Sequence, residues 1–246
     1  MNQTLFSFNK IGRCFLNLIY PSECQICKAS LDPVRKECLC GDCKAKIRLN
    51  LPPFCAKCGR SLINSVTALE LCNDCKSSNY HFRKVWAVGH YEGILKECIH
   101  LFKFNGKLSL APLFNELFLN FASSYMKIAL FDAIVPVPLH SSKIRERTFN
   151  QAELLAKNFG RKTKIPINTS CLIRIKNTSP QTELSKNKRF LNIKGAFGTK
   201  RSPLLKDKNI LLVDDVFTTG STLDECAKIL LGDGAKSVEC LVLARG

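Results

Sequence analysis

A short apolar strand that runs into two acids and a hydroxyl-rich loop is the feature that most limits how this chain can fold. Residues 210–213 are four consecutive apolar residues, a run typical of a strand buried in a parallel sheet. Asp214 and Asp215 stand at the carboxyl end of this strand, and the loop Thr218–Thr222 leads into a helical pattern. A loop at a helix start offers unpaired backbone N–H groups and the positive end of the helix dipole, which suit a phosphate.

The two acids help to decide between a ligand site and an ordinary helix cap. A capped helix after a buried strand explains Gly220 and one hydroxyl, but not two acids followed by four hydroxyl residues. Open α/β sheets bind ligands at the carboxyl ends of their strands. We therefore expect the loop to hold a phosphate, while Asp214 and Asp215 hold sugar hydroxyls or help to bind a divalent cation.

The length and charge of the chain point to an α/β core with an anionic partner. A chain of 246 residues can form one sizeable α/β domain and a small additional module. The formal net charge is +17, and residues 140–208 contain 17 Lys or Arg against 4 Asp or Glu. Scattered surface lysines would not concentrate the charge in this way, so we expect a pyrophosphate group or a nucleic acid as partner.

Eight of the fourteen cysteines form four CxxC pairs, which predict two zinc sites. Fourteen cysteines without a signal peptide are typical of a reducing, cytoplasmic location in which thiols bind metal. Four thiolates leave no open coordination position, so both Zn²⁺ ions are expected to be structural. Sequential pairing gives ribbons at 24–43 and 55–75, and an interleaved pairing is also compatible with the spacing. The predicted ligands are Cys24, Cys27, Cys40, Cys43, Cys55, Cys58, Cys72 and Cys75.

Apolar periodicity predicts the other elements of the chain. Residues 11–20 resemble a short amphipathic helix, which is too short and too polar to span a membrane, and no other stretch resembles a membrane span. From residue 82 the composition changes to that of an α/β domain. We expect strands at 85–89, 133–138 and 172–175 and helices at 94–106, 110–129 and 152–159.

Two further segments are rich in basic residues. The loop after the strand at 133–138 carries Arg145 and Arg147, and it would open at the same sheet edge as the loop Thr218–Thr222. Two such loops suit the two ends of a phosphorylated sugar diphosphate. Residues 176–208 are long, basic and poor in apolar periodicity. They are expected to form either a flap that closes over an anionic substrate or a disordered basic segment.

Four motifs together resemble the ComF family of competence proteins. They are the CxxC ribbons, VPVPLH followed by RERTFNQ, the segment at 174–184, and LLVDDVFTTGST. The resemblance covers essentially the whole chain. It implies an α/β fold, with a parallel-sheet domain like the type I phosphoribosyltransferases at 82–246. A double zinc ribbon at 21–80 and the short helix at 1–20 would precede it. The family usually has glycine where Thr148 stands.

The resemblance also implies a ligand, 5-phosphoribosyl 1-diphosphate (PRPP), and a role for each matching residue. Asp214 and Asp215 would be the catalytic pair that contacts the ribose. Displacement at the anomeric carbon would use Mg²⁺ and basic side chains to stabilise the departing pyrophosphate. The PRPP-binding residues would be Thr218, Thr219, Gly220, Ser221 and Thr222 for the 5′-phosphate, Arg145 and Arg147 for the pyrophosphate, and Arg174, Lys176 and Arg189 in the flap.

Three classes of function are compatible with these features. The first is a PRPP-binding transferase, associated with DNA uptake in natural transformation, whose acceptor the sequence does not identify. The second is a single-stranded DNA-binding protein of the competence machinery, in which Phe149 and Phe190 could stack on bases. The third is an adaptor, whose ribbons and residues 11–20 would contact a competence helicase or another DNA-uptake protein.

Overall fold

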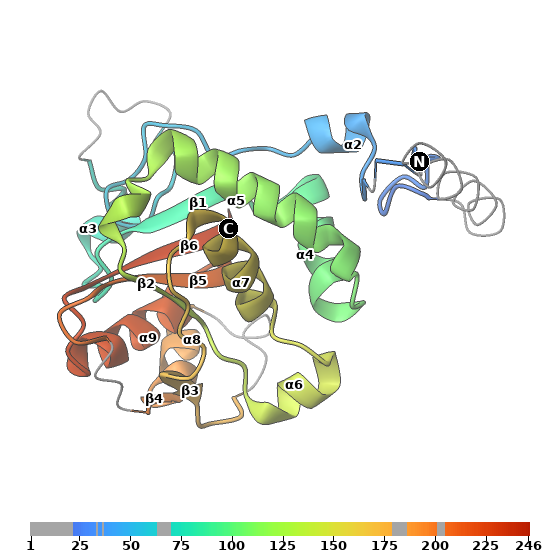
Figure 1. The fold of residues 1–246 in the computed structure, drawn as a ribbon. Coiled ribbons are helices and arrows are strands. Elements are labelled where there is room, and N and C mark those ends of the chain that lie inside the picture. The colour runs from blue at the N-terminus through green and yellow to red at the C-terminus, as the bar shows by residue number, and fades with distance from the viewer. Residues whose placement is uncertain (1–21, 33, 36, 63–69, 179–185, 201–204) are drawn as a thin grey trace, which may run out of the picture.

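A parallel sheet of four strands forms the centre of the protein (Figure 1). The strand order is β1-β6-β5-β2, and every neighbouring pair is parallel. A separate antiparallel pair joins β3 to β4. The strands are β1 (Val85–His90), β2 (Ala133–Pro136), β3 (Leu172–Arg174), β4 (Phe197–Thr199), β5 (Asn209–Phe217) and β6 (Ser237–Arg245).

The computed structural model describes residues 22–32, 34–35, 37–62, 70–178, 186–200 and 205–246. The helix predicted at 11–20 and part of the motif at 174–184 lie outside these residues. No helix in these ranges is long and apolar enough to cross a membrane. The helices are α2 (Gly41–Ala45), α3 (Asn73–Lys76), α4 (Gly93–Phe104), η1 (Leu108–Leu110), α5 (Ala111–Tyr125), η2 (Ile128–Leu130), α6 (Ser141–Arg147), α7 (Gln151–Thr163), α8 (Lys186–Ile193) and α9 (Ser221–Gly232).

Alternating residues of β5 divide the core between the two faces of the sheet. Leu211 and Val213 belong to a cluster with the apolar faces of α4, α5 and α7. Ile210 and Leu212 belong to a second cluster with the buried residues of α9. Successive side chains of a strand point to opposite faces, so a run of four apolar residues indicates burial on both faces. The parallel-sheet α/β fold expected from the sequence is confirmed.

The cysteine-rich segment is built onto this sheet. Cys24 and Cys43 lie in the cluster that contains α4 and α5, whereas Cys55 and Cys58 lie in the cluster that contains α9. The segment between the two cysteine groups runs along the free edge of β1, where the Asn50 amide donates to the Val88 carbonyl at 2.9 Å. This pairing covers a strand edge that would otherwise expose its backbone groups.

The main differences from the expected elements concern the ends of helices and strands and the basic segment at 176–208. Residues 176–208 contain helix α8 and strand β4, and β4 is held by pairing with β3 rather than by apolar periodicity of its own. Strand β5 continues through both acids to Phe217, because β6 runs alongside it as far as Arg245. Helix α5 ends at Tyr125, short of the predicted residue 129, and Met126 has an extended backbone.

Candidate functional site

Strand β2 ends before it reaches the two acids of its neighbour β5. β2 pairs with residues 210–213 of β5 only, so Asp214 and Asp215 continue beyond its last ladder residue, Pro136. The side chain of Asp215 is 7% exposed and forms an ion pair with Lys103, with Nζ 2.8 Å from Oδ2. Lys103 comes from the last turn of α4, and its carbonyl accepts a 3.3 Å hydrogen bond from the buried Gln151 amide.

The pKa of Asp214 is raised to about 7, first by burial and then by repulsion from the Asp215 carboxylate. Burial alone would lower the pKa of Lys103, but Asp215 and Asp214 outweigh it and the net shift is upward. Lys103 therefore stays cationic, while Asp214 is divided between acid and carboxylate near neutral pH. A cation or hydrogen-bond donor bound at Asp214 would displace its proton.

The loop before α9 has the form of an anion cradle. Gly220 caps the helix with φ +82°, a left-handed conformation that glycine adopts without strain. The hydroxyls of Thr219 and Ser221 are buried and lie 3.1 Å apart. The loop encloses a hollow of about 20 Å³, and Thr218 and Thr222 also line the larger cavity beside it.

Helix α6 carries basic residues of the second predicted loop. His140 caps this helix by accepting from the Ser142 amide through Nδ1. Lys143 pairs with Glu146 at 2.6 Å, and the Arg147 guanidinium lies 4.9 Å from the centre of the Phe104 ring. The helix ends at Thr148 with φ +66°, so the residue that departs from the family glycine occupies a left-handed position.

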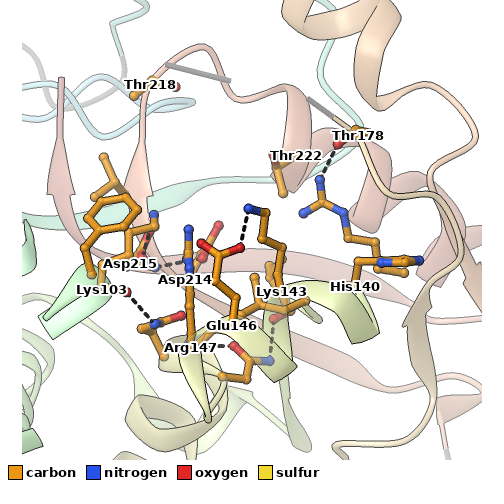
Figure 2. A pocket seen from close by; sticks show the side chains of 18 of the residues that line it. Lys103, His140, Lys143, Glu146, Arg147, Thr178, Asp214, Asp215, Thr218 and Thr222 are labelled. Carbon is orange, nitrogen blue, oxygen red and sulfur yellow. Dashed lines mark hydrogen bonds and ion pairs between the residues drawn. The ribbon is translucent and has the colours of Figure 1, made fainter. Parts of the chain in front are cut away.

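These elements surround one cavity of about 450 Å³ (Figure 2). Figure 2 shows Asp214 of β5, Lys143 and Arg147 of α6, and Thr222 of α9 turned toward the same space. The Nε atoms of Arg147 and Arg174 are buried and have no hydrogen-bond partner among the described residues. Unpaired guanidinium donors beside a hydroxyl loop suit an anion, because a buried donor without an acceptor is costly.

The structure gathers most of the residues predicted for the site. Arg145 and Lys176 are exposed and are not among those that line the cavity, and the side chain of Arg189 lies outside the described part. The predicted residues that line the cavity or its adjoining hollow are Asp214, Asp215, Arg147, Arg174 and Thr218–Thr222.

Several lining residues were not predicted, notably Lys103 and Gln151. A lysine in the last turn of a helix is expected to be solvated, and its partner Asp215 is 112 residues away. Phe104 is 53% exposed at the same cavity, in a segment that resembles an ordinary helix end. The base-stacking candidates differ from each other, since Phe149 packs on Phe102 with ring centres 5.4 Å apart while Phe190 is exposed.

The eight predicted cysteine ligands form two groups with sequential pairing. Within each group the four sulfur atoms lie within 4.8 Å of one another. Tetrahedral Zn²⁺ with Zn–S bonds of about 2.3 Å requires sulfur separations of about 3.8 Å, so both groups fit structural zinc. His81 lies outside both groups and pairs with Asp224 at 3.1 Å. The groups are Cys24, Cys27, Cys40 and Cys43, and Cys55, Cys58, Cys72 and Cys75.

Comparison with known proteins agrees with this architecture. The phosphoribosyl transferase domain family matches residues 147–246, and the double zinc ribbon domain family matches residues 15–76. Competence protein F of Haemophilus influenzae is 33% identical over 227 residues, which cover 90% of this chain and 96% of the relative. Competence protein ComFC of Bacillus subtilis is 34% identical over 218 residues, covering 85% of each chain. DNA utilization protein YhgH of Escherichia coli is 29% identical over 231 residues, 93% of this chain and 99% of the relative. With this likeness over nearly the full length, the chain belongs to the ComF family of competence proteins.

Proposed function

We propose that the cavity binds PRPP together with Mg²⁺, in a protein that takes part in DNA uptake. The observation that carries this proposal is the juxtaposition of an acid pair, a hydroxyl loop at a helix start and two half-buried arginines, whose buried Nε atoms have no partner among the described residues, around one cavity. A sugar with a phosphate at one end and a diphosphate at the other needs donors on both sides and acceptors between them. The names of the relatives, competence and DNA utilization proteins, support the cellular role.

Each part of the site has a defined task in this proposal. Backbone N–H groups of the loop Thr218–Thr222 bind the 5′-phosphate. Asp214 accepts from a ribose hydroxyl and gives up its proton as it does so. Lys103 holds Asp215 in place, and Arg147 and Arg174 pair with the diphosphate oxygens.

The acid pair also fits the way in which Mg²⁺ is usually held, by one or two carboxylates together with substrate phosphates. Asp214 and Asp215 would supply the carboxylates, and the ion would screen the charge of the diphosphate. If an acceptor displaces pyrophosphate, the bond from the anomeric carbon to the diphosphate oxygen breaks as the bond to the acceptor forms. Arg147 and Arg174 would then stabilise the charge on the leaving group.

Thermal unfolding of the zinc-loaded protein tests this proposal. PRPP with Mg²⁺ at one hundred times its Kd would stabilise the fold by about 2.7 kcal/mol, a rise in Tm of about 5–10 °C for a protein of this size. The paired substitution Asp214→Asn with Asp215→Asn is expected to remove the rise. Asp207→Asn, at an exposed position, should retain it. No rise in the unmodified protein, or an equal rise in the double variant, would contradict PRPP binding at this site.

A second candidate function, binding of single-stranded DNA, is favoured by a separate basic groove. This open groove of about 410 Å³ lies at the end of α7 and is lined by Lys157, Arg161 and Lys164 together with apolar residues. Phosphate contacts by lysine and arginine release counterions and make the affinity depend on salt. The adaptor function, which relies partly on residues 11–20, stays a prediction.

The salt dependence of DNA binding distinguishes these functions. Changing Lys157, Arg161 and Lys164 to glutamine should reduce the slope of log affinity against log salt by about one for each lost phosphate contact. The double asparagine variant of Asp214 and Asp215 should leave this slope unchanged. An unchanged slope in the groove variant would exclude this groove as the DNA-binding surface.

A further inference from the structure

The second cysteine group lies on the same face of the sheet as the hydroxyl loop, and the chain that leaves this group contacts the loop directly. Tyr80 follows Cys75 by five residues, and its hydroxyl donates to the Thr219 carbonyl at 2.9 Å. Tyr80 is 9% exposed, so water competes little for this bond. The next residue, His81, binds Asp224 in the first turn of α9 through its backbone amide.

Arg245 at the end of β6 forms a second connection between the cysteine group and the loop. Its Nη2 donates to Cys58 Sγ at 3.3 Å, and its guanidinium lies 5.3 Å from the centre of the Phe217 ring. Phe217 is the last residue of β5 before the loop, and it faces Arg245 in the β5–β6 register. One side chain therefore contacts both a cysteine sulfur and the residue from which the loop starts.

The loop fits closely against these aromatic residues. A Cβ atom at Gly220 would lie 2.9 Å from the Phe217 ring, closer than real Cβ contacts, and 3.0 Å from the Tyr80 ring, tighter than nearly all of them. Phe82 stacks on Tyr80 at 4.7 Å and meets Phe217 edge-on at 6.2 Å. Loss of either Tyr80 or Phe217 from its position would remove one of the two rings that pack on the left-handed Gly220.

The chemistry of the cysteine group explains how metal could control this contact. Four thiolates around Zn²⁺ carry a net charge of −2, which gives Arg245 an anionic partner at Cys58. A small module with four buried sulfur ligands also depends on the metal for its fold, and this fold holds Tyr80 in place.

The first cysteine group provides a comparison within the same molecule. Cys24 and Cys43 pack in the cluster on the opposite face of the sheet, with α4 and α5. Lys44 of α2 pairs with Glu116 of α5 at 2.8 Å. Neither this packing nor this ion pair involves Phe217, Thr219 or Gly220.

We propose that zinc at the second cysteine group holds the loop Thr218–Thr222 in its anion-binding form through the positioning residues Tyr80 and Arg245. Zinc at the first group does not have this effect. As far as the ligand is concerned, this inference rests on the proposed binding of PRPP at the loop. It makes zinc occupancy of one ribbon a determinant of affinity for the 5′-phosphate. Loss of zinc from that ribbon would therefore release the ligand before the sheet unfolds.

The experiment compares Tyr80→Phe and Arg245→Gln with Tyr125→Phe and Arg48→Gln in the full-length, zinc-loaded protein. Hydrogen–deuterium exchange of residues 216–223 reports on the loop without any ligand, and calorimetry reports the affinities for ribose 5-phosphate and PRPP. We expect faster loop exchange and affinities about threefold to tenfold weaker in the first pair of variants, the effect of one lost hydrogen bond. The second pair should match the unmodified protein. Zinc content should stay at two per chain in all four variants.

A second arm removes one zinc at a time with Cys58→Ser and Cys27→Ser. The inference requires faster loop exchange in the Cys58 variant and unchanged loop exchange in the Cys27 variant. Equal effects of the two cysteine changes, or normal loop exchange in both Tyr80→Phe and Arg245→Gln, would overturn it. If the unmodified protein binds neither ligand, the proposed function fails, and the exchange measurements alone decide whether zinc holds the loop.

Discussion

Replacing Asp214 by asparagine should stabilise the unliganded protein while it weakens the candidate site. The change removes a carboxylate that burial and Asp215 disfavour, and asparagine keeps the oxygen that accepts from the Asp215 amide at 2.8 Å. A raised pKa in the folded state means that the folded protein binds the proton more tightly than the unfolded chain does. The stabilisation that this proton provides is therefore complete below the pKa of Asp214 in the unfolded chain. It is lost as the pH rises through the pKa of Asp214 in the folded protein.

The size of this effect follows from the shift in the pKa of Asp214. The value rises from 3.8 to about 7, and each pH unit corresponds to about 1.4 kcal/mol, so the ionised carboxylate costs up to about 4 kcal/mol above pH 7. Relaxation around a buried charge reduces such penalties. We expect Asp214→Asn to be more stable than the unmodified protein by about 2–4 kcal/mol at pH 8, and by about 2 kcal/mol less at pH 5.5.

Urea unfolding of the zinc-loaded proteins, followed by fluorescence of the single tryptophan, Trp86, measures this difference. Asp207→Asn is the matched control, because the same chemical change at an exposed position should alter stability by less than about 0.5 kcal/mol at either pH. A gain in stability of the Asp214 variant that does not vary between pH 5.5 and pH 8 would contradict a raised pKa of Asp214 in the folded protein. So would a loss of stability at pH 8.

Three further predictions concern the backbone, the ion pair and the metal sites. Thr148→Gly should stabilise the protein by about 0.5–1 kcal/mol in urea unfolding, because φ is +66° at this position, and Thr148→Ala, which keeps the left-handed strain, should give no gain. Lys103→Met should lower the free energy of unfolding by about 2 kcal/mol or more, because it leaves the buried Asp215 without its counter-charge. The control is Lys107→Met at an exposed position, and an equal loss of stability in both variants would contradict a specific ion pair. Metal analysis should find two zinc ions per chain in the unmodified protein and in Cys38→Ser, and one in Cys40→Ser. A loss of zinc in the Cys38 variant would place this thiol among the ligands.

The order of chemical groups along β5 could be predicted because it is local. Four apolar residues in a row indicate burial on both faces of a sheet, and acids followed by a hydroxyl loop indicate a phosphate site at a helix start. The CxxC pairs likewise identify their own ligands, since two cysteines three positions apart can bind one ion whatever the rest of the fold does. The ends of the elements were harder to predict, because neighbouring strands set them. β6 extends β5 past both acids, and β3 gives β4 its partner.

Local patterns in the amino-acid sequence predict the α/β core, the two four-cysteine sites, and the acid pair before a hydroxyl loop. The contacts between these groups are set by the tertiary structure. It pairs Lys103 with Asp215, assigns the cysteines sequentially, and joins Cys58 to the loop through Arg245. Apolar periodicity and covalent spacing act over a few residues, so they leave a clear pattern in the sequence. Contacts between residues more than a hundred positions apart depend on how the strands are ordered in the sheet and which face each segment covers, and no local pattern records that choice.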